Sequence, residues 1–254
     1  MTPRVVVTIA GSDSGGGAGI QADLKTFAAL GVYGVSVITA ITAQNTLGVT
    51  GIHPVPAESV AAQLDAVLSD FDVAAVKVGM IGDPAIVTVI AERAADLPNL
   101  VVDPVLVATA GSRLGDVDVV RGLTAYAEIL TPNRHEAGAL VGRAIETAGE
   151  MAEAAAEIGQ SGARAVAVTG SEVALDVLWC EGRLIELHGE PVKTENNHGS
   201  GCTFSSAIAV RLALGDTIPD AVVTAKDYVA GALRGGSEWR LGAGPGPLNH
   251  FWQF

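Results

Sequence analysis

The chain opens with VVVTIA at residues 5–10, GSDSGGGAG at residues 11–19 and IQADLKTFAAL at residues 20–30. An unbroken β-branched run predicts a strand that is buried on both faces, which is typical of a parallel sheet. The glycine-rich stretch predicts a polar loop, and the third segment predicts a helix. A strand, a loop and a helix in this order form the first unit of an α/β protein.

The same alternation continues to the end of the chain. Further strands are predicted at residues 34–41, 73–78, 100–102, 128–130 and 165–169, with a hairpin formed by residues 173–179 and 183–187. Further helices are predicted at residues 58–68, 84–95, 151–160, 203–214 and 219–233. We therefore expect a mostly parallel central sheet with helices on both faces. No linker, repeat or low-complexity tract interrupts the pattern, so residues 1–254 are expected to form a single domain.

Composition excludes several classes of partner. The 254 residues carry a formal net charge of −13, whereas nucleic acid and anionic membranes require a basic face. Residues 1–9 lack the basic region and cleavage site of a signal peptide, and no run of about eighteen apolar residues predicts a membrane span. The two cysteines, Cys180 and Cys202, have no metal-ligand spacing, so both are expected to be reduced thiols in the cytoplasm. The expected partners are small molecules.

Polar or glycine-containing segments follow the predicted parallel strands. In such a sheet the carboxyl ends of the strands meet at one edge, where ligands bind. The segments expected at this edge are SDS at residues 12–14, QN at 44–45, GM at 79–80, DP at 103–104, TPN at 131–133 and TG at 169–170. Their convergence predicts a binding site.

HGSGCT at residues 198–203 directly precedes an apolar run that predicts a helix. Two glycines around a serine allow a tight turn that points successive N–H groups one way, and the helix start adds a positive partial charge. This combination predicts an anion site with the Cys202 thiol beside it. Two other interpretations stay open on this segment alone: a simple turn before a helix, and a cysteine that is only a small buried apolar residue.

Three common nucleotide and hydrolase motifs are missing from the sequence. None of the four lysines follows a glycine, which excludes a P-loop. The stretch GGGAG at residues 15–19 does not fit Gly-x-Gly-x-x-Gly, so a dinucleotide-binding fold is not favoured. No Gly-x-Ser-x-Gly elbow occurs, which disfavours a hydrolase of that type.

Taken together, these segments resemble the motifs of a known enzyme family. The chain carries TIAGSDSGGGAGIQAD at residues 8–23, TAQNT at 42–46, VDPV at 102–105, TPNRHEA at 131–137, HGSGCT at 198–203 and GPLNHF at 246–251. In this order they resemble hydroxymethylpyrimidine/phosphomethylpyrimidine kinases, the thiamine-pathway branch of the ribokinase-like superfamily. The resemblance spans nearly the whole chain. It implies a ribokinase-like fold, ATP and Mg²⁺ as cofactors, and a homodimer.

The reaction that the resemblance implies is ATP-dependent phosphorylation of 4-amino-5-hydroxymethyl-2-methylpyrimidine and then of its monophosphate. Gln44 is expected to read the aminopyrimidine edge, because an amide offers both a donor and an acceptor. The family pattern also places Asp23 and Gly11 near the substrate, and Met80 and Val107 against the faces of its ring. For Met80 and Val107 an ordinary core position is the other interpretation.

The resemblance assigns further residues to Mg²⁺ and ATP. Asp103 and Glu136, with Asn133, would support Mg²⁺ directly or through water, because this ion takes oxygen ligands and keeps several waters. Asn133, Thr169 and Gly170 would lie at the nucleotide. Asn133 followed three residues later by Glu136 also fits a capping box at the start of a helix, and both roles can hold together.

In the family pattern, the transferring phosphoryl group is bound by Gly199, Ser200, Gly201 and Cys202. Most members of the superfamily have an aspartate at the position of Cys202, where it takes the proton of the alcohol. A thiolate can do the same if its pKa is lowered, and the start of a helix is expected to lower it. Phosphoryl transfer depends mainly on charge stabilisation and alignment, so a moderate base can be enough.

The chain departs from the family pattern at residues 169–172, where TGSE replaces a lysine followed by Gly-Gly-His. That lysine would neutralise nucleotide phosphates, so Mg²⁺ is expected to take over more of this task. Pyridoxal kinases of the same superfamily carry a threonine at this strand end, so a pyridoxal or pyridoxine kinase is the alternative enzyme. A degenerate kinase that binds a pyrimidine as a regulator is the third hypothesis, and the intact glycine–cysteine loop argues against it.

Overall fold

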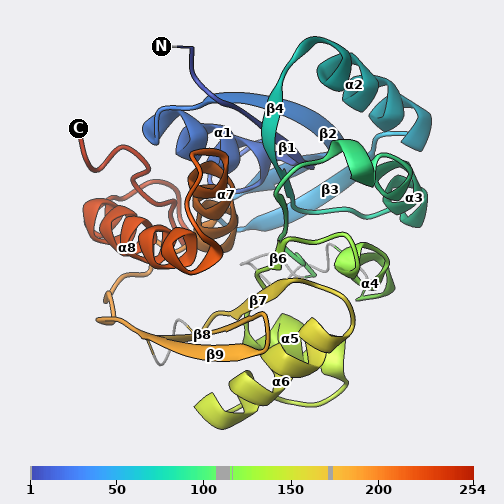
Figure 1. Ribbon diagram of the computed structural model, residues 1–254. Coiled ribbons are helices and arrows are strands. Elements are labelled where there is room, and N and C mark those ends of the chain that lie inside the picture. The colour runs from blue at the N-terminus through green and yellow to red at the C-terminus, as the bar shows by residue number, and fades with distance from the viewer. Residues whose placement is uncertain (1, 107–114, 116, 171–173) are drawn as a thin grey trace.

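The strands form one sheet in the order β3-β2-β1-β4-β5-β6-β7-β8-β9 (Figure 1). The structure is a computed structural model, and it describes residues 2–106, 115, 117–170 and 174–254. The strands are β1 (Val5–Asp13), β2 (Tyr33–Asn45), β3 (Gly48–Pro54), β4 (Val73–Val78), β5 (Leu100–Val102), β6 (Ile129–Leu130), β7 (Ala165–Val168), β8 (Leu175–Cys180) and β9 (Arg183–His188). Neighbouring strands from β2 to β7 pair in parallel, and β3, β8 and β9 pair antiparallel. The prediction of a mostly parallel sheet is confirmed.

Helices cover both faces of this sheet, as predicted. They are α1 (Gly19–Ala29), α2 (Ala57–Asp70), α3 (Pro84–Glu92), the short 3-10 helix η1 (Ala94–Asp96), α4 (Val117–Thr124), α5 (Arg134–Val141), α6 (Ala148–Gln160), α7 (Ser200–Ala213) and α8 (Ile218–Gly236). One apolar core forms under α1, α7 and α8 and contains Phe27 and Val222. A second core forms under α2 to α6 and contains Leu64 and Met151. The two sets of helices lie on opposite sides of the sheet in Figure 1.

Strand β1 shows why its sequence contains no polar alternation. Val6 packs into the core under α1, α7 and α8, whereas Val7 and Ile9 pack into the other core. None of these three side chains is exposed to solvent. Because both faces of the strand are buried, successive positions must all be apolar. The carboxyl end of β1 then leads into the glycine-rich loop before α1.

Three elements were not predicted from the apolar pattern of the sequence. Strand β3 is an edge strand with mostly exposed side chains, so no apolar pattern marks it. Helices α4 and α5 have only eight residues each, which leaves too few turns for a clear helical period. Helix α7 begins at Ser200, three residues earlier than expected, and this places Cys202 in its first turn.

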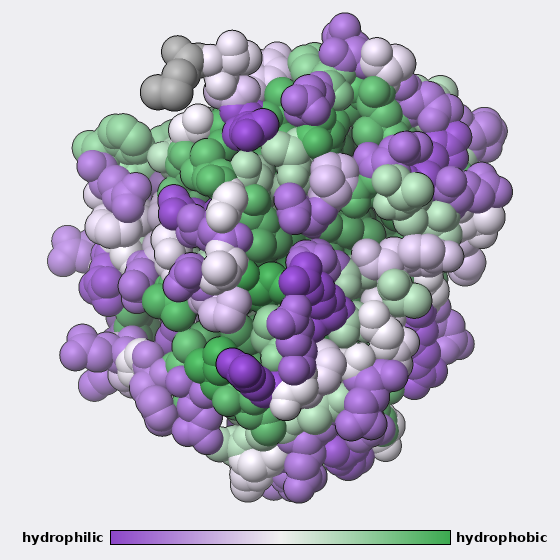
Figure 2. Space-filling view, viewed as in Figure 1, coloured by the Kyte–Doolittle hydropathy of each residue, from purple (hydrophilic) through white to green (hydrophobic). Residues whose placement is uncertain are grey.

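The face drawn in Figure 2 carries both polar and apolar residues. Figure 2 shows polar residues over most of one face, with apolar residues visible between them. Within the described part of the chain, no helix combines the length and the apolar character needed to cross a membrane.

Candidate active site

A cavity of about 490 Å³ lies at the carboxyl ends of the parallel strands, against the start of α7. The structure brings most of the predicted site residues together around it: Gly11, Gln44, Met80, Asp103, Asn133, Glu136, Thr169, Gly199, Ser200, Gly201 and Cys202. Asp23 and Gly170 do not line the cavity, and Val107 lies outside the described residues. Lining residues without a predicted role include Asp13, His135, His198 and Phe204.

Two glycines allow the loop after β1 to touch the loop before α7. Gly199 is the N-cap of α7 and has φ of 87°, a left-handed conformation that favours glycine. A Cβ at Gly199 would overlap the backbone oxygen of Gly17, and a Cβ at Gly17 would overlap the imidazole of His198. The sequence therefore needs glycine at both positions to close the cavity on this side.

The start of α7 presents open N–H groups. The N–H of Ser200 donates to a preceding backbone oxygen at 3.2 Å, and that of Thr203 donates to Gly199 O at 2.9 Å. No acceptor from the described residues meets the N–H groups of Gly201 and Cys202. These two donors and the positive end of the helix dipole can bind an anion in the cavity.

Cys202 does not have the low pKa that its helical position suggests. The thiol is half-buried at the cavity wall. Burial has the largest effect on its pKa and raises it; Lys77 lowers it, Asp103 and Asp23 raise it, and the resulting pKa is about 12. The expectation of a lowered pKa is therefore wrong. Loss of hydration and two nearby carboxylates disfavour the thiolate more than the helix start favours it.

Two buried carboxyl groups, Asp103 and Glu136, line the same cavity, and Asp103 interacts with this thiol. Burial raises the pKa of Glu136, the charge of Asp103 raises it further, and it reaches about 8. Burial also raises the pKa of Asp103, against the effect of Lys77, which lowers it. Each carboxyl group thus ionises less readily than a free one, because the surrounding protein balances a negative charge at this place only in part.

This donor set fits Mg²⁺. Carboxylate oxygens are the ligands that this ion prefers, and a cation would favour the ionised forms of Asp103 and Glu136, which burial now disfavours. Among the described residues, no group of three His, Cys, Asp or Glu side chains is arranged to hold a metal ion. Mg²⁺ typically uses one or two carboxylates together with waters and substrate phosphates, so two carboxylates are sufficient.

A buried ion pair lies behind the wall of the cavity. Lys77 Nζ lies 3.0 Å from both carboxylate oxygens of Asp23 and 3.9 Å from Asp103 Oδ2. Asp23 also accepts hydrogen bonds from Thr8 Oγ1 at 2.6 Å and Ser206 Oγ at 2.7 Å. Neither Lys77 nor Asp23 is exposed. Asp23 therefore lies behind the cavity wall, not at its surface where a substrate would touch it, because Lys77 and the two hydroxyls occupy its oxygens.

Asn133 and Glu136 form the capping box that their spacing predicts. Asn133 Oδ1 accepts from the Glu136 N–H at 2.9 Å, and Glu136 Oε2 accepts from the Asn133 N–H at 2.9 Å. Glu136 Oε1 accepts a longer bond from the Leu106 N–H at 3.4 Å. The capping interpretation is confirmed, and the same bonds hold the Glu136 carboxylate at the cavity wall.

Gln44 and Met80 also line the cavity. The Met80 side chain is almost fully buried, and a Cβ at Gly11 would approach its sulfur to 3.1 Å. Met80 therefore fills core space and also lines the cavity. The Gln44 amide is half-buried, with Oε1 3.1 Å from Thr42 Oγ1 and Nε2 3.5 Å from His198 Nε2.

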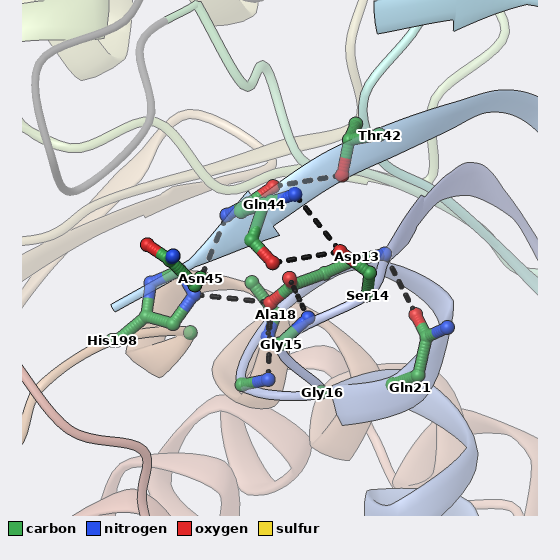
Figure 3. A network of polar contacts seen from close by, with 12 residues as sticks. Asp13, Ser14, Gly15, Gly16, Ala18, Gln21, Thr42, Gln44, Asn45 and His198 are labelled. Carbon is green, nitrogen blue, oxygen red and sulfur yellow. Dashed lines mark hydrogen bonds and ion pairs between the residues drawn. The ribbon is translucent and has the colours of Figure 1, made fainter. Parts of the chain in front are cut away.

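Asp13 joins the two loops around Gln44 (Figure 3). Asp13 Oδ2 accepts from the N–H groups of Gly17 at 3.0 Å and Ala18 at 2.8 Å, and lies 3.1 Å from His198 Nε2. Burial would raise the pKa of Asp13, but His198 and the backbone N–H groups of Ala18 and Gly15 lower it below its usual value. Asp13 is thus an ionised acceptor at neutral pH. The sequence placed it in a polar loop but gave no sign of its contact with His198, 185 residues away.

Thr169 and Gly170 differ in their position relative to the cavity. Thr169 lines the cavity, as expected of a residue at the nucleotide. Gly170 lies outside the lining, and its N–H donates to Asp176 Oδ1 at 3.0 Å. Asp176 Oδ2 in turn pairs with Lys226 Nζ at 2.6 Å. The backbone donor of Gly170 is therefore used within the protein.

The sheet order, the two helical layers and the cavity at the strand ends define a ribokinase-like α/β fold. Solved structures share it: pyridoxal kinase from Staphylococcus aureus in complex with AMP-PCP and pyridoxal has a TM-score of 0.91 and 33% identity, over 100% of this chain and 95% of that one. Phosphomethylpyrimidine kinase from Clostridium difficile 630 has a TM-score of 0.79 and 40% identity, over 91% of this chain and 99% of that one.

Sequence comparison identifies the family. The family model described as phosphomethylpyrimidine kinase matches residues 13–249. The hydroxymethylpyrimidine/phosphomethylpyrimidine kinase of Rhizobium meliloti (strain 1021) is 48% identical over 257 aligned residues, which cover 97% of each chain. The chain belongs to the phosphomethylpyrimidine kinase family, and it is a phosphotransferase. The resemblance stated from the motifs is confirmed.

Proposed function

We propose that this kinase transfers the γ-phosphoryl group of ATP to 4-amino-5-hydroxymethyl-2-methylpyrimidine, and then to its monophosphate, in thiamine biosynthesis. One observation carries the proposal: the Gln44 amide and the open N–H groups of Gly201 and Cys202 face one cavity. An amide suits the donor and acceptor edge of an aminopyrimidine, and open helix N–H groups suit a phosphoryl group. Relatives that are 45–48% identical over nearly the full chain carry the matching name.

In the transfer, the oxygen of the hydroxymethyl group attacks the γ-phosphorus, the bond to the β-phosphate oxygen breaks, and ADP leaves. The N–H groups of Gly201 and Cys202 would bind the charge on the transferred group. The proton of the alcohol passes to the Cys202 thiolate. Since the thiol has a pKa of about 12, the thiolate is the minor form at neutral pH. Mg²⁺, held by Asp103 and Glu136, would neutralise phosphate charge.

A pyridoxal kinase is the second candidate. It is favoured by the structural likeness, since the pyridoxal kinase from Staphylococcus aureus has the higher TM-score, 0.91 against 0.79. Identity favours the pyrimidine kinase, at 40% against 33% for the same two structures. The two rings differ at the edge that Gln44 faces, because an aminopyrimidine carries an amine donor and pyridoxal carries a phenolic oxygen.

A coupled assay of ADP production tests the proposal. We expect turnover with the aminopyrimidine alcohol and with its monophosphate, and at least tenfold lower kcat/KM with pyridoxal. Preference for pyridoxal would support the second candidate, and no turnover with any alcohol would support a binding protein.

The Gln44→Leu variant should lose pyrimidine affinity by about 1–3 kcal/mol while ATP affinity changes little, as measured by calorimetry. Equal losses for both ligands would mean that Gln44 is structural.

We further propose a single kinase domain over residues 1–254 that works as a homodimer in the cytoplasm. Support for the dimer comes from apolar side chains at one sheet edge, where Ile41 is 55%, Leu47 67% and Ile52 39% exposed. Light scattering at assay concentration tests it, and the mass of one chain, 25.7 kDa, would contradict it.

A further inference from the structure

The hydrogen-bond partners around Gln44 conflict with the orientation of its amide in the structure. Thr42 Oγ1 lies 2.9 Å from the Ser12 backbone oxygen, which can only accept, so the one hydroxyl hydrogen of Thr42 points there. The same hydroxyl lies 3.1 Å from Gln44 Oε1. With its hydrogen already used, Thr42 can offer only a lone pair to Gln44, and two acceptors then face each other.

The other end of the amide has the opposite conflict. His198 Nε2 lies 3.1 Å from the ionised Asp13 Oδ2, which can only accept, so Nε2 carries a hydrogen whether the ring is neutral or charged. Gln44 Nε2 lies 3.5 Å from the same nitrogen, so two donors face each other. Figure 3 shows both contacts on one side chain.

A half-turn of the amide resolves both conflicts together. After this rotation, Gln44 Nε2 donates to the lone pair of Thr42 Oγ1, and Gln44 Oε1 accepts from His198 Nε2–H as the weaker branch of a bond shared with Asp13. Amide oxygen and nitrogen have nearly the same size, so their positions are decided by such partners. Thr42 and His198 belong to different segments, and they require the same orientation independently.

We propose that Asp13 and His198 are positioning residues that, with Thr42, fix the Gln44 amide with its oxygen toward His198 and its nitrogen toward Thr42, and so set which ring the cavity selects. This inference rests on the proposed function. One N–H and one oxygen lone pair of Gln44 remain for a ligand. The N–H lies on the Thr42 side of the amide, and the lone pair lies on the His198 side. An aminopyrimidine edge has a fixed order as well, with the amine as donor and the ring nitrogen as acceptor. Its donor must therefore lie on the His198 side.

The fixed order also gives selectivity between ring types. A phenolic hydroxyl can donate or accept, so a pyridoxal-type ring can adapt to either orientation of the amide. An aminopyrimidine cannot adapt, and a reversed amide leaves unmatched polar groups at the interface. Loss of the His198 donor or the Thr42 hydroxyl should therefore weaken binding of the aminopyrimidine more than binding of the phenolic ring.

Two substitutions test the mechanism by kinetics. His198→Phe keeps a ring against Gly17 but removes the donor, and Thr42→Val removes the hydroxyl while Thr42→Ser keeps it. We expect His198→Phe and Thr42→Val to raise KM for the aminopyrimidine alcohol about 10- to 100-fold, with kcat and the KM for pyridoxal changed less than about threefold. Thr42→Ser should retain the KM of the original protein. His188→Phe, at an exposed histidine on β9, controls for the substitution itself. Equal losses for both rings would overturn the inference.

A spectroscopic measurement keeps the test independent of the substrate. In ¹⁵N spectra of the labelled protein without substrate at pH 8, His198 Nε2 should show the shift of a protonated nitrogen, and nuclear Overhauser effects should place the Gln44 amide hydrogens near Thr42. An unprotonated Nε2, or amide hydrogens near His198, would overturn the inference. If the protein fails to phosphorylate the aminopyrimidine, the proposed function fails, and these spectra still decide the orientation of Gln44.

Discussion

Glu136→Gln should make the protein more stable at alkaline pH than it is with the native residue. Glu136 has a pKa of about 8 in the folded protein, against 4.5 for an ordinary glutamate. Between these two values the folded state holds the proton and the unfolded state releases it. The free energy of unfolding therefore falls as pH rises through this window. Glutamine is neutral at every pH, and its oxygen can still accept from the Asn133 N–H, so the cap is kept.

The size of the effect follows from the two pKa values. A shift from 4.5 to about 8, at about 1.4 kcal/mol for each pH unit, gives an upper bound of about 5 kcal/mol by pH 8. Asp103 lies close enough to respond when Glu136 ionises, so the measured loss should be smaller than this bound. We expect the original protein to lose about 2–4 kcal/mol between pH 5 and pH 8 relative to the Glu136→Gln variant.

Urea unfolding at pH 5, 6.5 and 8, with a chelator present, measures this difference. Glu150→Gln is the matched control, because Glu150 closes the capping box of α6 at a partly exposed position and its pKa is lowered. That control should keep the alkaline loss of stability. Mg²⁺ at pH 8 should stabilise the original protein more than the Glu136→Gln variant. Parallel pH curves for the original protein and Glu136→Gln would refute the reasoning.

Three other substitutions have defined outcomes. Lys77→Met should lower the unfolding free energy by about 3–5 kcal/mol in urea, because it leaves the buried Asp23 unpaired, and adding Asp23→Asn should recover part of it. Cys202→Ala should bind both substrates yet lose about 10²–10⁴-fold in kcat, with partial recovery in Cys202→Asp. In the original protein kcat/KM should rise with pH up to at least pH 9, since the thiol has a pKa of about 12, and a flat profile would exclude the thiolate as base. Thr169→Lys should lower the KM for ATP, most at low Mg²⁺, and a higher KM at every Mg²⁺ level would mean that Thr169 does not face the phosphates.

The sequence predicted the parts of the fold that local pattern controls. The β-branched run at the start of β1 is buried on both faces, and its position beside β2 and β4 follows from the parallel order. The capping box was readable because its two residues lie three positions apart and bond to each other's N–H groups. Strand β3 was missed since an exposed edge strand needs no apolar alternation.

The sequence predicted most residues of the candidate site, but it did not predict their pKa values or ion pairs. Strand ends and loops placed most lining residues correctly, because parallel strands all finish at one edge. The contact of Lys77 with Asp23 joins residues 54 positions apart, and only a lone lysine in the apolar run VAAVKV signalled it. The pKa of Cys202 depends on burial and on Asp103, which no local pattern reports.

The charges around Cys202 link its ionisation to cation binding. Asp23, Asp103 and Glu136 are three buried carboxyl groups with one buried ammonium group, that of Lys77, among them. Burial and the charges of Asp103 and Asp23 disfavour the Cys202 thiolate, and the two carboxyl groups of Asp103 and Glu136 favour a cation between them. A cation there adds positive charge near the thiol, so binding must lower the pKa of Cys202, and by thermodynamic reciprocity the thiolate must strengthen cation binding. Asp103 takes part in both effects, so the ionisation of Cys202 would depend on whether a cation is bound.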